Sequence, residues 1–135
     1  MSSLSGIIVK RPPLICDGCG HPKARCTCLE DALIQQLRFA GLPEPERECR
    51  LSDRRKFRFD LCWRDRLLAV EIEGGIYTGG AHGRLTGIKR DIEKGRLAVL
   101  AGWRVLRFHG DEVRDGTALS VIEFALKLFA KGESR

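Results

Sequence analysis

Hydrophobic residues recur at helical spacing in three stretches of the chain. The stretches cover residues 30–41, 88–102 and 117–129. Gly41 ends the first, Gly102 stands at the C-terminal cap of the second, and Asp115 or Thr117 caps the start of the third. The apolar positions of the predicted helices are Leu33, Ile34, Leu37 and Phe39, then Ile92, Leu97, Val99 and Leu100, and finally Val121, Ile122, Ala125, Leu126 and Phe129. We expect the last set to form a buried face.

Alternation of apolar and polar residues predicts two strands that pair as a hairpin. The first strand carries Phe57, Phe59, Leu61 and Trp63 on one face and Arg58, Asp60 and Cys62 on the other. The second strand carries Leu68, Val70 and Ile72 on one face and Ala69, Glu71 and Glu73 on the other. The link at residues 64–66 is short, so we expect the two strands to pair antiparallel.

A third strand is predicted at residues 103–108, where both faces are mostly apolar. Such a strand is typical of a sheet interior that is covered on both sides. Residues 74–84 are rich in glycine and predict a loop. The order of helix, strands, helix, strand and helix therefore indicates one α/β domain over residues 30–135, preceded by an irregular arm over residues 1–29.

Length and composition exclude two broad classes of protein. A chain of 135 residues has the size of one ordinary domain, which excludes a multi-domain machine. No apolar run approaches the roughly 20 residues that cross a bilayer, which excludes a membrane protein. The first five residues lack the charged and apolar regions of a secretory signal. We therefore expect a cytoplasmic protein, in the cytoplasm of the bacterial host if the chain is encoded by a phage.

The charge balance favours a phosphate-bearing partner. The net charge is +6, and 17 of the 24 cationic residues are arginine, whose guanidinium matches two phosphate oxygens at once. One basic run leads directly to Asp60, and a second follows the glycine-rich stretch. The residues that we expect to contact DNA are Arg54, Arg55, Lys56 and Arg58 in the first run and Arg84 and Arg90 in the second. The alternative for both runs is solvated surface.

Three acidic residues gather on the predicted hairpin without an intervening lysine. Asp60, Glu71 and Glu73 all lie opposite the apolar stripes, where facing like charges destabilise a sheet. A divalent cation with oxygen ligands, Mg²⁺ or Mn²⁺, converts this repulsion into attraction. In a basic protein, such a site suits phosphodiester hydrolysis, because the cation acidifies a water and neutralises the leaving oxygen.

The acidic pattern resembles the signature of the restriction-endonuclease-like, or PD-(D/E)XK, nuclease superfamily. Within that superfamily, the chain looks like the phage and bacterial branch that is related to very-short-patch repair endonucleases. The matching stretches are Phe59-Asp60, 69–75, His82, 91–94, 102–108 and Glu112-Val113. The resemblance implies a four-stranded mixed sheet flanked by helices, with a fourth strand at residues 46–51, and DNA as the substrate.

The resemblance also assigns roles to single residues. It makes Asp60 and Glu71 metal ligands, with the Ile72 carbonyl as a third contact and Glu30 as an acidic contribution from the first helix. Glu73 departs from the signature, because it stands where the superfamily has a lysine that orients the attacking water. The candidates for the missing chemistry are Lys94, His82 and Glu73 itself, as a base or second-metal ligand.

Four of the six cysteines lie within thirteen residues of the arm. Cys16-X2-Cys19 and Cys26-X-Cys28 suit a tetrahedral zinc site, which a segment too short for its own core would need to hold its shape. His21 could replace one of these cysteines as a ligand. Cys49 and Cys62 stand alone, and we expect both to be buried or neutral thiols.

These observations lead to three possible functions. The first is a Mg²⁺-dependent DNA endonuclease with a structural zinc arm, acting in phage or prophage DNA recombination, repair or processing. The second is a structure-selective nuclease such as a Holliday-junction resolvase, which would need a homodimer. The third is a noncatalytic DNA-binding protein that has kept the nuclease fold.

Overall fold

The computed structural model describes residues 19–20, 26–52, 55–73 and 81–130. These residues form helices and strands that alternate along the chain. In chain order they are α1 (Cys28–Phe39), β1 (Glu46–Ser52), β2 (Arg55–Trp63), the 3-10 turn η3 (Arg64–Arg66), β3 (Leu68–Glu73), α2 (Ala81–Leu100), β4 (Arg104–His109), α3 (Gly110–Arg114) and α4 (Thr117–Leu128). Within the described part of the chain, no helix is both long enough and apolar enough to cross a membrane.

The strands form one mixed sheet in the order β1-β2-β3-β4. β1 pairs antiparallel with β2, β2 antiparallel with β3, and β3 parallel with β4. The parallel pair needs a crossover, which α2 supplies between β3 and β4. The structure thus confirms an α/β domain with a four-stranded mixed sheet flanked by helices, including the strand expected at residues 46–51.

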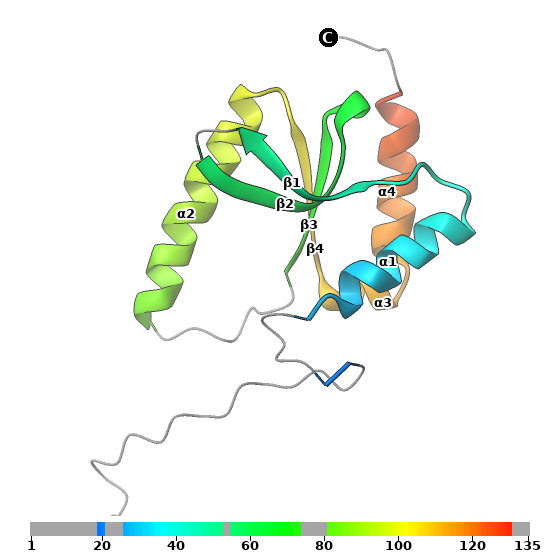
Figure 1. Cartoon of the computed structure of the whole chain (residues 1–135), viewed down its shortest axis with the longest axis horizontal. Helices are drawn as coiled ribbons and strands as arrows, with labels where there is room; N and C mark the ends of the chain where they lie inside the picture. The colour runs from blue at the N-terminus through cyan, green and yellow to red at the C-terminus, as the bar shows by residue number, and fades with distance from the viewer. Residues whose placement is uncertain (1–18, 21–25, 53–54, 74–80, 131–135) are drawn as a thin grey trace, which may run out of the picture.

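Helices cover both faces of the sheet, as Figure 1 shows. α1, α3 and α4 pack on one face, and their apolar residues join Leu61, Leu68 and Val70 in the larger hydrophobic cluster. α2 packs on the other face, where Ala98 and Trp103 meet Phe59 and Ala69 in a smaller cluster. β4 contributes Leu106 and Phe108 to the first cluster and Val105 to the second, so it is covered on both faces, as its sequence indicates.

The predicted alternation along β2 is wrong at Asp60. Leu61 and Trp63 lie in the larger cluster, whereas Phe59 lies in the smaller one, although Phe59 and Leu61 are two residues apart. The carboxylate of Asp60 accepts a hydrogen bond from the Ile72 backbone N–H at 2.7 Å. Backbone pairing of β2 with β3 runs from Trp63↔Leu68 to Leu61↔Val70. Just past that point, the hydrogen bond to the Asp60 side chain replaces backbone pairing between β2 and β3. This interrupts the alternation of side chains along β2.

One predicted boundary and one predicted burial are also wrong. α2 begins at Ala81, inside the stretch expected to be a loop, and a short helix, α3, follows β4 directly at Gly110. Phe39, the last residue of α1, is exposed. Val121, which we expected in the buried face, is 37% exposed because α4 turns its other face to the sheet. That other face carries the buried residues Ala118, Ile122, Ala125 and Leu126.

Cys49 and Cys62 form a disulfide, which corrects the expectation of two separate thiols. The two residues lie on the neighbouring strands β1 and β2, and both are buried. Their Cα atoms are 6.2 Å apart, within the range that a disulfide spans. The pairing depends on the register between β1 and β2, which the sequence pattern of either strand alone does not contain.

Candidate active site

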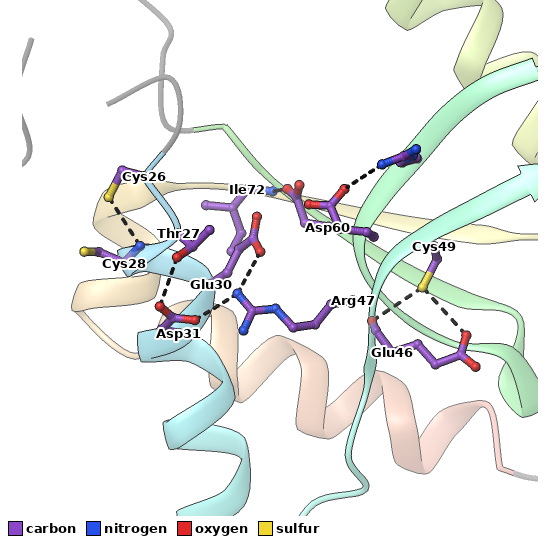
Figure 2. A network of polar contacts seen from close by, with 12 residues as sticks. Cys26, Thr27, Cys28, Glu30, Asp31, Glu46, Arg47, Cys49, Asp60 and Ile72 are labelled. Carbon is purple, nitrogen blue, oxygen red and sulfur yellow. Dashed lines mark hydrogen bonds and ion pairs between the residues drawn. The ribbon is translucent and has the colours of Figure 1, made fainter. Parts of the chain in front are cut away.

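Three carboxylates from three elements converge at one end of the hairpin. Glu30 comes from α1, Glu48 from β1 and Asp60 from β2, and one oxygen atom of each lies within 4.8 Å of the others. Arg47 pairs with Leu61 and Cys49 with Phe59, so Glu48 stands opposite Asp60 across the two strands. Figure 2 shows the side chains of Glu30 and Asp60 pointing toward one another. We call Glu30, Glu48 and Asp60 the acidic cluster.

Glu30 is largely enclosed, and its surroundings change its pKa. Its side chain is 15% exposed. Burial, and after it the negative charge of Asp60, raises the pKa of Glu30 above its ordinary value, while Arg47 acts in the opposite direction. Arg47 holds Glu30 at 3.2 Å and Asp31 at 2.8 Å, as Figure 2 shows. The acidic cluster is thus a place where negative charge is crowded and only partly balanced by the protein.

Glu71 lies outside the acidic cluster and has two cationic partners. It is buried, and one carboxylate oxygen accepts a hydrogen bond from Lys94 of α2. The other oxygen lies 3.5 Å from the Nε of Arg107, which faces Glu71 because β3 and β4 place these two residues side by side. Glu73 is more exposed and lies 3.9 Å from the Nη1 of Arg107.

Lys94 is directed into the molecule rather than toward solvent. Its ammonium also donates to the carbonyl of Arg58 and lies 4.6 Å from the centre of the Phe59 ring. Burial lowers the pKa of Lys94 to about 8, an effect that the charge of Arg107 reinforces and the charge of Asp60 opposes. This lysine therefore reaches Glu71 from α2, on the side of the sheet away from α1.

Three cysteine sulfurs gather at the start of α1. The Sγ atoms of Cys19, Cys26 and Cys28 lie within 4.8 Å of one another, and those of Cys19 and Cys26 are 3.6 Å apart. The backbone N–H of Cys28 donates to the Cys26 sulfur at 3.3 Å, a contact visible in Figure 2. Thiolates at this separation fit a tetrahedral metal such as zinc. Cys16 and His21, the other candidate ligands, lie outside the described residues.

The predicted DNA-contacting residues are described only in part. Arg58 and Arg90 are exposed on β2 and α2, and both lie beside Lys94 around one hollow of the surface. Arg54 lies outside the described residues. The same holds for the side chains of Arg55, Lys56, Arg84 and His82, whose backbones belong to β2 and α2.

Sequence reasoning missed two residues of this site, Glu48 and Arg107. Glu48 carries a signal in the structure, because its φ of 53° lies in the left-handed region that non-glycine residues seldom adopt. In the sequence it is one acid in a charged segment, and only the pairing of β1 with β2 brings it to Asp60. Arg107 likewise becomes relevant only when β4 is placed beside β3.

No protein-family model, curated protein or solved structure matches this chain. The interpretation of the site therefore depends on its residues and their geometry.

Proposed function

We propose that the protein is a metal-dependent DNA endonuclease that hydrolyses phosphodiester bonds in phage or prophage DNA recombination, repair or processing. The observation that carries this proposal is the convergence of Glu30, Glu48 and Asp60 within 4.8 Å. Three carboxylates at this distance repel each other unless a cation lies among them. Oxygen ligands of this kind suit Mg²⁺ or Mn²⁺.

The acidic cluster would hold the cation, and Asp60 is its best-anchored member. The Ile72 N–H fixes one oxygen of Asp60 at 2.7 Å. When bound, the metal would lower the pKa of a coordinated water and neutralise charge on the phosphate. The Ile72 carbonyl and Glu71 are further ligands suggested by the resemblance to the PD-(D/E)XK signature, although here Glu71 contacts Lys94 and Arg107.

Lys94 supplies the positive charge that the PD-(D/E)XK signature provides from the strand itself. In this chain, Glu73 occupies the strand position, and Lys94 reaches the neighbouring Glu71 from α2. With its pKa near 8, Lys94 is cationic in most molecules at neutral pH and can donate a proton to a developing oxyanion. Glu73 is then free of the role that the signature gives to its position.

The arm before α1 would bind a structural zinc ion. Cys19, Cys26 and Cys28 supply three sulfur ligands, and Cys16 or His21 supplies the fourth. Zinc at this point would fix the start of α1, and with it the approach of Glu30 to the other two carboxylates.

A noncatalytic DNA-binding protein is the second candidate, and one observation favours it. Both oxygens of Glu71 have cationic partners within the protein, so Glu71 is neutralised without a metal ion. A protein that has lost catalysis but kept its basic surface would look similar at this residue. The two candidates differ in the acidic cluster, because unneeded carboxylates beside DNA would weaken binding.

A cleavage assay separates these candidates. Purified protein is incubated with Mg²⁺ or Mn²⁺ and four substrates, namely linear duplex, single-stranded, mismatched and four-way-junction DNA. We expect metal-dependent cleavage of at least one substrate, and a loss of at least about a hundredfold in the Asp60→Ala variant. Glu123→Ala, which removes a partly exposed carboxylate from α4, is the matched control and keeps full activity. Equal inactivity of wild type and Asp60→Ala on every substrate would leave the DNA-binding candidate in place.

A further inference from the structure

α2 turns small or polar residues toward the sheet and larger apolar residues away from it. Among the described side chains of α2, only Ala98 is buried, and Lys94 points into the molecule with 12% of its side chain exposed. By contrast, Ile88, Ile92 and Val99 are 52%, 56% and 73% exposed. A helix that packs on one sheet normally places its apolar stripe against that sheet. The reverse arrangement indicates that α2 meets a second apolar surface.

The exposed apolar residues of α2 form one stripe. The residues four, seven and eleven positions after Ile88 are Ile92, Gly95 and Val99. They lie within about 40° of Ile88 around the helix axis, because each residue of an α-helix advances by about 100°. A methyl group placed at Gly95 would meet no side chain and no other element within 4 Å, so a second helix can approach closely there. We call these four residues the α2 stripe.

The spacing of the α2 stripe is that of a seam between two helices. Its steps of four, three and four residues match a heptad in which Ile92 and Val99 take the a positions. Ile88 and Gly95 then take the d positions. In parallel coiled coils, β-branched residues at the a positions favour pairs of helices. The surface that this pattern fits best is a helix with the same pattern, which is α2 of a second copy of this chain.

The charges beside the α2 stripe select a parallel orientation. Asp91 and Arg96 flank the stripe on opposite sides, at the g and e positions. Both are exposed, and neither takes part in an ion pair within the part of the chain that the structure describes. In a parallel pair, Asp91 of each copy faces Arg96 of the other, so the attraction occurs twice. In an antiparallel pair, Arg96 would instead face Lys89, a like charge.

We propose that two copies of this chain form a homodimer through a parallel contact between their α2 stripes. The same residues of each copy meet about a two-fold axis. Lys94 points away from this contact, so its hydrogen bond to Glu71 is undisturbed. The contact uses one helix from each chain and is therefore small, so we expect a dissociation constant on the order of 10 μM. The inference does not rest on the proposed function, because no residue of the acidic cluster takes part.

Sedimentation equilibrium of the purified full chain tests the contact. We expect the mass to rise with concentration from the 15.1 kDa of one chain to twice that value. Ile92→Ser should raise the dissociation constant by at least about tenfold, because it removes an apolar contact from both copies. Phe124→Ser, which removes an apolar side chain that is 66% exposed on α4, is the matched control and leaves the constant unchanged. Circular dichroism of the dilute variants checks that both fold.

Charge reversal tests the orientation. In the parallel pair, Arg96→Asp sets two carboxylates against each other, so we expect the dissociation constant to rise by about tenfold at low ionic strength. Asp91→Arg alone should have a similar effect. The double variant Asp91→Arg/Arg96→Asp pairs opposite charges again and should return the constant to within about threefold of the wild type. Arg90→Asp, which reverses an exposed cation on the other side of α2, is the control for net charge.

Each outcome supports or contradicts the homodimer. The mass of one chain at every concentration would show that the α2 stripe does not bind a second copy. A dimer that Phe124→Ser disrupts and Ile92→Ser leaves intact would place the contact on α4. A tighter dimer in Arg96→Asp would mean an antiparallel pair, which contradicts the proposed orientation. Cleavage of DNA by a monomer would contradict the dimer alone, and a dimer that cuts no DNA would contradict the nuclease alone.

Discussion

At the scale of single residues, the local backbone positions the carboxylates of the acidic cluster. Asp60 uses one oxygen to hold the Ile72 N–H, which fixes its direction, and the break in β2 at this residue separates Phe59 from Leu61. Glu48 stands opposite Asp60 with a left-handed backbone. A pair of like charges in this position costs stability unless it binds a cation.

The first prediction concerns Glu48, which is the most exposed residue of the acidic cluster. Replacing Glu48 with glutamine keeps its shape but removes one negative charge from the cation site. We expect Mn²⁺ affinity to fall by about tenfold, measured by titration calorimetry, because affinity depends on the number of charged ligands. Glu44→Gln is the control, since Glu44 pairs with Arg38 on the surface. Equal Mn²⁺ affinities in the two variants would remove Glu48 from the site.

The second prediction compares lysine substitutions at Glu71 and Glu73. Glu71→Lys places a third cation against Lys94 and Arg107 at a buried position, so we expect lost activity and a lower melting temperature. Glu73 is more exposed, and Glu73→Lys restores the residue of the PD-(D/E)XK signature at that position. We therefore expect Glu73→Lys to retain more cleavage activity and more stability than Glu71→Lys. The reverse order of activities would identify Glu73 as a ligand.

At the scale of elements, α1 connects the cysteines to the acidic cluster. Cys28 is the first residue of α1, and Glu30 lies two residues further on. The Thr27 hydroxyl donates to Asp31 at 3.1 Å, and Arg47 bridges Asp31 and Glu30. The first turn of α1 therefore lies between the cysteine sulfurs and the carboxylates, as Figure 2 shows.

The third prediction follows from this connection. Protein purified without added zinc should contain about one zinc ion per chain, measured by elemental analysis, and Cys26→Ser should lose most of it. Loss of zinc should also weaken Mn²⁺ binding at the acidic cluster, because Glu30 is no longer held in place. Adding zinc back to chelated wild type should restore both properties. Zinc-free wild-type protein with full Mn²⁺ affinity would show that the arm does not position Glu30.

The sequence predicted the individual helices and strands better than it predicted which of them lie side by side. The period of two in β3, the cap at Gly102 and the apolar face around Ile122 are local properties, and the structure has all three. The approach of Glu30 to Asp60 was expected only from the family resemblance. Glu48, Arg107 and the Cys49–Cys62 pair each depend on which strands lie side by side, and no local pattern records that.

At the scale of the whole molecule, the two helix layers position different residues of the site. The layer of α1, α3 and α4 holds most of the core and positions Glu30, whereas α2 contributes Ala98 to the smaller cluster and positions Lys94 and Arg90. The sheet between these layers must therefore keep its strands in register for the site to form. The disulfide between β1 and β2 lies within that sheet, in the smaller cluster beside Phe59.

The fourth prediction is that this disulfide stabilises the fold. It closes a loop with a sequence separation of 13, for which loop entropy gives about 3 kcal/mol. The double variant Cys49→Ala/Cys62→Ala should therefore melt on the order of 10 °C below the wild type, measured by circular dichroism. Dithiothreitol should lower the wild-type melting temperature by a similar amount and leave the double variant unchanged.

Thiol labelling of the denatured, zinc-free protein decides the same point independently of stability. The Cys49–Cys62 disulfide hides two thiols, so reduction should raise the number of reactive thiols by these two, to the six cysteines of the chain. A reducing compartment keeps most thiols reduced, and the burial of both residues is what would protect this pair there. Six reactive thiols in protein taken directly from cells would mean that the fold in the cell is held by the sheet and its two helix layers without the covalent link.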